Sequence, residues 1–263
     1  MRENKITEVA PNMNILVNVK SLDLSYNPIT EHSLKTIMTE PKTVRHLSLA
    51  NCSMDTIYVL EMPFLRSIDV SHNEIKSVDD TIFKRTTLLD TLDLSYNKFY
   101  TLTSVFPGSL KNLDLSGNPL TGINGHHFPQ SLENIKLNHL KNVMKVEKTA
   151  LTLKNLKSLE LYDLPKLGYL DIRGVLSNLQ YLEKFDLEVK DHQIVDQIHP
   201  GLNSRVKEIG LRGRRVRAIS TGAFAGTLNT QKIFSFCPSP SPCLNSVIFT
   251  FSFHYAIYRF NIP

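Results

Sequence analysis

The sequence predicts an α/β solenoid, with a parallel sheet on its concave side and loops and short helices on its convex side. Three observations predict it. The pattern L-x-x-L-x-L-x-x-N returns along the 263 residues and is clearest at 19–27, 89–97 and 110–118. Its ninth position recurs in steps of 23, 25, 21, 24, 21, 22, 24, 26 and 24 residues, as stacked structural repeats require. Apolar residues alternate at Leu22 and Leu24, which is the two-residue period of strands.

Each repeat begins with a strand whose fourth and sixth positions face inward. Because neighbouring repeats stack, these positions form one continuous apolar core, and the positions between them face outward from the sheet. We expect nine strands in chain order, each centred on the fourth position. These centres are Leu22, Leu47, Ile68, Leu92, Leu113, Ile135, Leu159, Phe185 and Ile209.

The ninth position marks where the chain turns away from the sheet. It holds Asn4, Asn27, Cys52, Asn73, Asn97, Asn118, Leu140, Leu164, Lys190 and Arg214. An asparagine here pairs backbone groups whose burial without partners costs about 1–3 kcal/mol each. We expect a ladder of these side chains, and a less regular second half because the ladder stops after Asn118.

A second apolar column is expected on the convex side, ten residues after the ninth position. It holds Ile37, Met62, Phe83, Phe128 and Phe224, with Phe106 one place early. These side chains are expected to fill the space behind the sheet.

The chain divides into a solenoid at 1–230, with about nine to ten repeats, and a tail at 231–263 that lacks the repeat. Repeat arrays need polar or disulfide-closed caps at their ends. Neither end of the solenoid has one, so we expect an uncapped array, as in a fragment of a longer protein, and a poorly ordered tail.

The formal charge of +5 is concentrated in one short segment. This basic patch consists of Arg205, Lys207, Arg212, Arg214, Arg215 and Arg217. A nucleic-acid-binding domain would carry a broader basic stripe. Four interpretations stay open for the patch: a site for a sulfated glycan, a site for phospholipid, a dibasic processing site and a solvated edge of the last strand.

Outward positions on the concave side supply the candidate binding face. They are Asp23, Tyr26, Asp69, His72, Asp93, Tyr96, Asp114, Lys136, Glu160, Tyr162 and Asp186. Strands lie about 4.8 Å apart, so Asp69, Asp93 and Asp114 are expected to align. Aligned carboxylates can perform acid–base chemistry or bind a cation, but aspartate is also ordinary usage at this position of such repeats.

The sequence offers no catalytic, cofactor-binding or metal-binding set of residues. No serine lies in a recognisable nucleophile motif, and no glycine-rich phosphate loop is present. His72 and His139 lie three repeats apart, too far to share a metal. We therefore expect a non-enzymatic protein without a cofactor.

The nine-residue pattern is the signature of leucine-rich repeats, and the chain resembles the extracellular leucine-rich-repeat proteins of animals. The segment 219–226 is similar to the convex part of their repeats. The irregular copies at 182–192 and 206–213 resemble those of chaoptin-type adhesion proteins of insects. The resemblance implies a leucine-rich-repeat horseshoe, a location outside the cell or at its surface, and membrane attachment through an anchor absent from this chain.

We therefore expect a protein-binding module of a cell-surface adhesion or recognition protein, with a protein partner that is either a second copy or a different protein. Two alternatives stay open, a fragment of a Toll-type receptor ectodomain and an intracellular leucine-rich-repeat scaffold. In a secreted protein, the sequon Asn51-Cys52-Ser53 predicts a glycan on Asn51.

Overall fold

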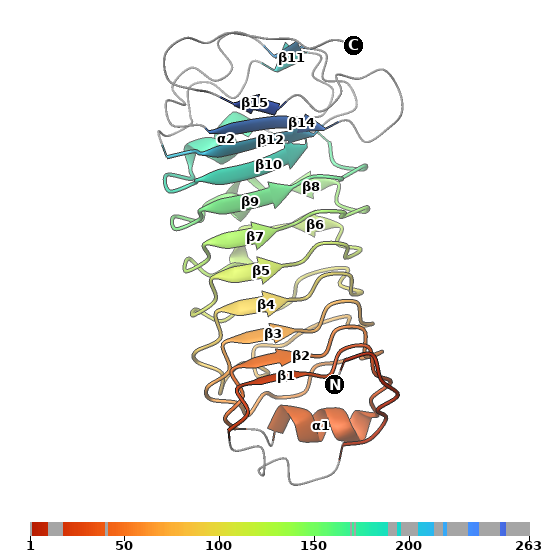
Figure 1. The fold of residues 1–263 in the computed structure, drawn as a ribbon. Coiled ribbons are helices and arrows are strands. Elements are labelled where there is room, and N and C mark those ends of the chain that lie inside the picture. Colours follow the sequence, from red (N-terminus) through yellow and green to blue (C-terminus); the bar gives the residue numbers. More distant parts are fainter. Residues whose placement is uncertain are drawn as a thin grey trace.

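In the computed structural model the chain forms a stack of coils, with one strand of a large sheet in each coil (Figure 1). The structure describes residues 2–9, 18–39, 42–168, 170, 172–188, 194–195, 205–212, 218–219, 231–236 and 248–250. The strands of this large sheet lie side by side along one side of the stack, and helices, turns and loops connect them. This is the predicted leucine-rich-repeat horseshoe.

The large sheet has eleven strands in the order β1-β2-β3-β4-β5-β7-β9-β10-β12-β14-β15. All neighbours are parallel except β14 and β15. The bounds are β1 Ser21–Asp23, β2 His46–Ser48, β3 Ser67–Asp69, β4 Thr91–Asp93, β5 Asn112–Asp114, β7 Asn134–Lys136, β9 Ser158–Leu161, β10 Lys184–Glu188, β12 Glu208–Arg212, β14 Lys232–Phe236 and β15 Ile248–Thr250.

The nine predicted strand centres are confirmed. They lie opposite one another in unbroken register from Leu22 in β1 to Ile209 in β12. All nine side chains are buried. The stacked leucines and isoleucines therefore form one core that runs the length of the sheet.

Shorter elements lie outside the large sheet. They are α1 Glu31–Thr39, β6 Gly122–Ile123, η2 Gly125–His127, β8 Lys145–Val146, η3 Lys148–Leu151, α2 Ile172–Ser177, β11 Ile194–Val195 and β13 Ala218–Ile219. Of these, α2, β6 and β8 lie behind the large sheet, where the convex side was predicted (Figure 1). The first turn of α1 has a side-chain cap, because the hydroxyl of Thr30 accepts the N–H of Ser33 at 3.4 Å. An ion pair of 2.8 Å between Glu31 and Lys35 spans its next turn.

The asparagine ladder is confirmed at Asn27, Asn73, Asn97 and Asn118, which are all buried. Each amide nitrogen donates to the sixth-position carbonyl of its own coil. Those of the last three also donate to the same carbonyl of the preceding coil, at 2.9, 3.0 and 2.9 Å. Cys52 replaces this bond with a thiol contact of 3.4 Å to the Leu24 carbonyl. The ladder therefore ties each coil to the coil before it.

After Asn118 the ladder gives way to apolar packing. Leu140 and Leu164 are fully buried in the ninth position, and Lys190 and Arg214 lie outside the described residues. The strands of the large sheet lengthen there, from three residues in β1–β5 and β7 to four in β9 and five in β10 and β12. The expected change in regularity is therefore visible in the sheet itself.

The convex apolar column is confirmed where the structure describes it. Its five described members, Ile37, Met62, Phe83, Phe106 and Phe128, are all buried. The rings of Phe106 and Phe128 stack with centroids 6.5 Å apart. Phe224 lies outside the described residues.

The sheet continues past residue 230, where the sequence analysis places the end of the repeats. β14 pairs in parallel with β12, with Ile233 opposite Ile209. The N–H of Gln231 donates to the carbonyl of Lys207 at 2.8 Å, as the equivalent groups of earlier coils do. The tail was predicted to be poorly ordered. Most of it, at 237–247 and 251–263, lies outside the described residues.

Candidate protein-binding face

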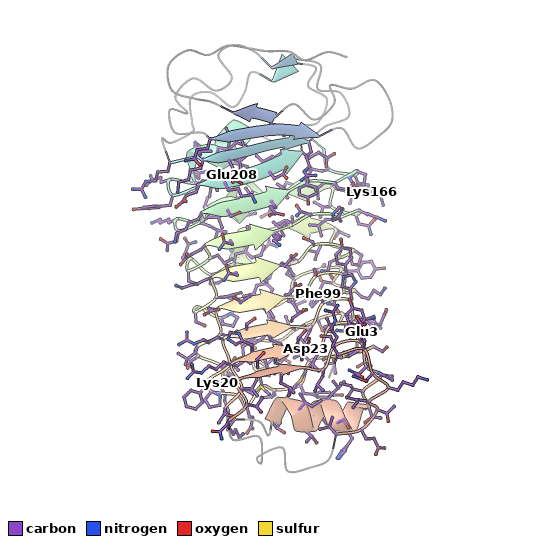
Figure 2. All side chains as sticks on the ribbon, viewed as in Figure 1. Glu3, Lys20, Asp23, Phe99, Lys166 and Glu208 are labelled. Carbon is purple, nitrogen blue, oxygen red and sulfur yellow. The ribbon has the colours of Figure 1, made fainter. Side chains whose placement is uncertain are left out.

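The outward face of the sheet carries the predicted row of carboxylates at the fifth position (Figure 2). Asp69, Asp93 and Asp114 lie opposite one another in β3, β4 and β5, so their predicted alignment is confirmed. Asp23 and these three each accept the backbone N–H two residues later, at 3.0, 2.9, 2.9 and 2.9 Å. One oxygen of each carboxylate therefore holds the turn after its strand. The other oxygen of Asp69 accepts the Ser48 hydroxyl at 3.3 Å, and that of Asp114 faces Lys136.

The middle of this row disfavours negative charge. Burial raises the pKa of Asp93, and the neighbouring carboxylates of Asp114 and Asp69 raise it further. At Asp23 burial also acts to raise the pKa, but hydrogen bonds from Ser25 and the charge of Arg2 lower it overall. The ionised carboxylate is thus least favoured at Asp93, at the centre of the row, where a nearby cation of a partner would stabilise it.

The remaining predicted charges of this face contact neighbouring coils. Lys136 forms an ion pair of 3.6 Å with Asp114. Glu160 accepts the amide of Asn138 at 2.8 Å. The row therefore changes from acidic on β1–β5 to mixed charge on β7–β9.

The eighth position of every described coil adopts a left-handed backbone. Positive φ angles, between 54° and 73°, occur at Tyr26, Asn51, His72, Tyr96, Gly117, His139 and Asp163. This conformation turns the chain out of the strand, and it costs other residues about 1–2 kcal/mol relative to glycine. The result is a column of outward side chains along the edge where the strands end.

Rings stack along this column. His72 and Tyr96 lie parallel with centroids 4.4 Å apart, and Tyr96 reaches His139 at 6.4 Å. Tyr96 bridges an intervening coil because Gly117 leaves room: a Cβ there would lie 2.4 Å from the ring. His139 also bonds Asp163 at 2.7 Å. His139 and Gly117 are members of this surface that sequence reasoning missed, although their shared eighth position was a usable signal.

At the C-terminal end of the face, Arg212 joins two predicted site residues. Its guanidinium donates to both oxygens of Asp186, at 2.9, 2.8 and 2.6 Å, and lies 3.7 Å from the ring centre of Tyr162. Burial raises the pKa of Tyr162. Arg212 was predicted in the basic patch, but its contacts place it on the candidate binding face, because β12 pairs with β10.

Of the other five residues of the basic patch, two contact side chains of the same chain and three lie outside the described residues. Lys207 forms an ion pair of 2.7 Å with Glu183, and Arg205 lies 4.7 Å from the ring centre of Tyr181. Arg214, Arg215 and Arg217 lie outside the described residues. The described half of the patch is thus already engaged within the chain.

The described part of the chain gives little support for a metal site, an enclosed small-molecule pocket or a membrane-spanning helix. No three histidine, cysteine or acidic side chains converge there to hold a metal ion. The two best-formed hollows are open and hold about 180 and 230 Å³. No described helix is long and apolar enough to cross a membrane.

Comparison with known families agrees with this geometry. The leucine-rich-repeat family matches residues 63–120, and a second description of the same repeat matches 18–39 and 109–135. Residues 18–39 and 63–135 of the chain are leucine-rich repeats. The matched ranges cover the regular coils that carry the asparagine ladder, so the family match and the hydrogen bonds rest on the same residues.

Several leucine-rich-repeat relatives are similar to this chain. Chaoptin of Drosophila melanogaster is 30% identical over 124 residues, which cover 46% of this chain and 9% of chaoptin. Human lumican is 29% identical over 78% of this chain and 61% of its own length. Human oligodendrocyte-myelin glycoprotein is 32% identical over 52% of this chain and 30% of its own length. The chain thus spans less than two thirds of each relative.

Solved structures share the leucine-rich-repeat fold. A chain of the Drosophila Toll–Spatzle complex superposes with a TM-score of 0.64 and 19% identity, covering 89% of this chain and 32% of that chain. A chain of the octameric complex of latrophilin 3, Unc5D and the FLRT2 leucine-rich-repeat domain gives a TM-score of 0.65 at 16% identity, covering 87% and 78%. At these identities the likeness shows the fold alone.

Proposed function

We propose that this chain is a protein-binding module of a cell-surface adhesion or recognition protein, and that its concave face contacts the partner. One observation carries the proposal. Outward side chains of nine hydrogen-bonded coils form an open, mostly polar surface with exposed rings along one edge. Tyr26 and Tyr96 are 39% and 43% exposed there. Tyrosine and arginine are enriched at the energetic centres of protein interfaces.

The shape of this face favours a macromolecule over a small ligand. Sites for small molecules are usually enclosed clefts of about 300–1,000 Å³. The two hollows found among the described residues are smaller and open, whereas the sheet offers a continuous surface many strands wide. A partner can therefore contact many coils at once, as solenoids generally allow.

The comparisons support a protein partner and a location outside the cell. The two solved structures compared above, of Toll with Spatzle and of FLRT2 with latrophilin 3 and Unc5D, are complexes with other proteins. One relative is named a glycoprotein, and this chain has an exposed asparagine at its sequon. A catalytic role has no support from the residues of the face, whose carboxylates hold turns and ion pairs.

Cell-surface binding tests the proposal. The chain would be secreted as a dimeric fusion and its binding to cultured cells measured by flow cytometry. Tyr96→Ala removes an exposed ring from the face and is expected to weaken cell binding about tenfold or more, as central aromatic residues of interfaces do.

Tyr100→Ala is the matched control, since Tyr100 is 61% exposed and lies after the strand, outside the face. It is expected to bind like the parent chain. Equal binding by all three proteins, with unchanged thermal melting, would refute a role for the concave face.

A further inference from the structure

The second position of each coil, just before the strand, forms a ladder of ion pairs along one edge of the sheet. From Arg66 onward the sign of the charge alternates, through Asp90, Lys111, Glu133, Lys157, Glu183 and Lys207. The nitrogen–oxygen distances are 3.8 Å for Arg66–Asp90, 3.3 Å for Lys111–Glu133, 2.6 Å for Lys157–Glu133 and 2.7 Å for Lys207–Glu183. We call this set the ion ladder.

The ion pairs of the ion ladder lower the pKa of two of its carboxylates. The hydrogen bond from Lys157 is the main cause that lowers the pKa of Glu133, and the bond from Lys207 does the same for Glu183. These pairs are exposed, so each contributes little to stability. Their main effect is that alternating charges on this edge are balanced within the chain.

The alternation fails at the N-terminal end of the same edge. There three cations, Lys20, Arg45 and Arg66, occupy consecutive coils. Backbone hydrogen bonds of 2.7 and 2.8 Å join their coils directly. Arg66 pairs with Asp90, but neither Lys20 nor Arg45 pairs with a carboxylate in the described residues. Like charges on adjacent strands, about 4.8 Å apart, repel each other.

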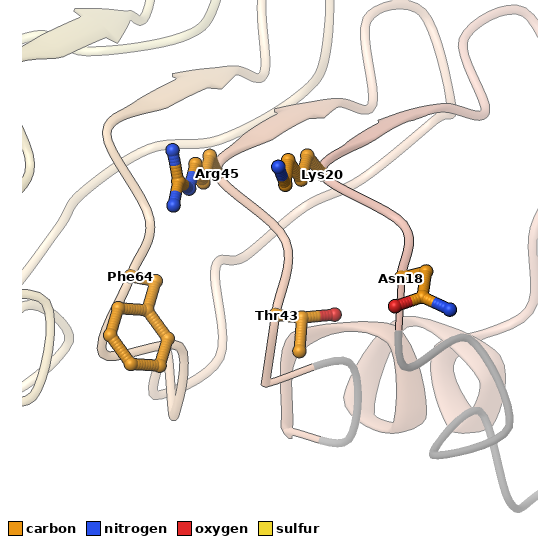
Figure 3. Close-up of a pocket in the computed structure, with 5 residues that line it drawn as sticks. All are labelled: Asn18, Lys20, Thr43, Arg45 and Phe64. Carbon is orange, nitrogen blue, oxygen red and sulfur yellow. The ribbon is translucent and has the colours of Figure 1, made fainter.

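Lys20 and Arg45, which pair with no carboxylate of the described residues, line a hollow. Figure 3 shows Lys20 and Arg45 where their coils enter β1 and β2, with Asn18, Thr43 and Phe64 on the preceding turns. These five residues line a space of about 180 Å³. The hydroxyl of Thr43 donates to the Val19 carbonyl at 3.1 Å, which fixes one wall. The space suits one inserted side chain, not a drug-sized ligand.

An apolar surface adjoins the hollow. Phe64 is 51% exposed and Leu88, in the same position of the next coil, is 42% exposed. Isolated exposed apolar residues are ordinary, but this pair lies in register beside two cations that have no carboxylate partner among the described residues. A phenyl ring and a guanidinium together are typical of interface centres.

We propose that this edge, defined by Lys20, Arg45, Phe64 and Leu88, docks an acidic segment of a partner protein. A glutamate or aspartate carboxylate of the partner lies between Lys20 and Arg45 and supplies the missing negative charge of the ladder. An apolar side chain next to it covers Phe64 and Leu88. The guanidinium of Arg45 can bind a carboxylate through two hydrogen bonds, which sets the orientation of the segment.

The neighbouring apolar pair favours a protein segment over a sulfated glycan, since a glycan presents no apolar side chain to cover Phe64 and Leu88. The site also differs from the predicted basic patch, whose described members are engaged within the chain. The inference rests on the proposed protein-binding function only in that the ligand is a protein. It concerns the edge of the sheet and not its concave face.

Fluorescence anisotropy with defined probes tests the proposal on the purified chain. The probe is a labelled ten-residue peptide with two Glu-Glu pairs around a Leu-Phe pair. Its counterpart carries glutamine at all four glutamates, and a labelled heparin octasaccharide is the third probe. The acidic peptide is expected to bind at least about tenfold more tightly than the glutamine peptide, and binding is expected to weaken with added salt.

Three variants locate the site. The double variant Lys20→Gln/Arg45→Gln and the single variant Phe64→Ser are each expected to weaken peptide binding about tenfold. Arg45→Glu restores the alternation of charge from Lys20 to Asp90. It is therefore expected to abolish peptide binding while leaving thermal stability equal or higher, which separates loss of binding from loss of folding.

Lys157→Gln/Lys207→Gln is the matched control, because it removes two lysines from the same position of paired coils. It is expected to change affinity less than twofold. The proposal is overturned if no probe binds, if the glutamine peptide binds equally, or if only heparin binds. It is also overturned if the control weakens binding as much as Lys20→Gln/Arg45→Gln. Each of these results leaves the concave-face experiment unaffected.

Discussion

Replacing Asn73 by alanine measures how much stability one rung of the asparagine ladder contributes. Asn73 is 3% exposed and makes five hydrogen bonds. It donates to the carbonyls of Leu49, Val70 and Ser71 and accepts the N–H groups of Cys52 and Met54, all at 2.9–3.1 Å. Alanine removes all five bonds and places no other polar group in the site.

Two of the five backbone groups that lose a hydrogen bond to Asn73 keep another hydrogen-bond partner. The Val70 carbonyl also accepts from the Asn97 amide. The Ser71 carbonyl also accepts from the backbone N–H of Asn51. The other three groups, the Leu49 carbonyl and the N–H groups of Cys52 and Met54, keep no other hydrogen bond among the described residues. At about 1–3 kcal/mol for each buried unpaired group, and with relaxation lowering the sum, the loss is expected to be about 3–5 kcal/mol.

Urea unfolding followed by circular dichroism measures this loss. For a chain of this size, about 4 kcal/mol corresponds to a fall in Tm of roughly 10 °C. Asn155→Ala is the control, because Asn155 is exposed and makes one side-chain bond, so its change is expected within about 0.5 kcal/mol. A loss below about 1 kcal/mol for Asn73→Ala would refute the reasoning, since water would then replace the amide at little cost.

Three further predictions concern the concave face. Gly117→Ala is expected to lower Tm, because it adds left-handed strain of about 1–2 kcal/mol and a Cβ that displaces the Tyr96 ring; an unchanged Tm contradicts this. Asp93→Asn is expected to raise Tm at pH 7. Burial and two neighbouring carboxylates raise the pKa of Asp93, so parent stability falls as pH rises above about 4, and the advantage of the variant should vanish at pH 3. Secreted from animal cells, Asn51→Gln is expected to lose one glycan, seen as a shift in gel mobility; equal sensitivity of parent and variant to a glycosidase contradicts it.

The sheet could be predicted from the sequence because each position of the repeat has one physical role. The fourth-position residues from Leu22 to Ile209 must be buried, and the two-residue alternation leaves one register that achieves this. β14 was missed although Ile233 follows Ile209 by 24 residues, within the range of the repeat. Ser235 holds its apolar sixth position and Pro238 its ninth, so the pattern is too weak to recognise.

The candidate site was only partly predictable. Membership of the acidic row follows from the repeat, since Asp69, Asp93 and Asp114 share one position. The pairing of Arg212 with Asp186 depends on the register between two irregular coils, which local sequence does not specify. The ion ladder, in contrast, is visible once the second positions are read in order.

Site-specific photo-crosslinking tests the central claim, that the concave face contacts a protein, most directly. A photoreactive phenylalanine would replace Tyr96 on the face or Tyr100 outside it, and the secreted chain would be irradiated on the cells that it binds. We predict a discrete crosslinked protein from position 96 and none from position 100. Crosslinking from position 100 alone, or equally from both positions, would contradict the claim.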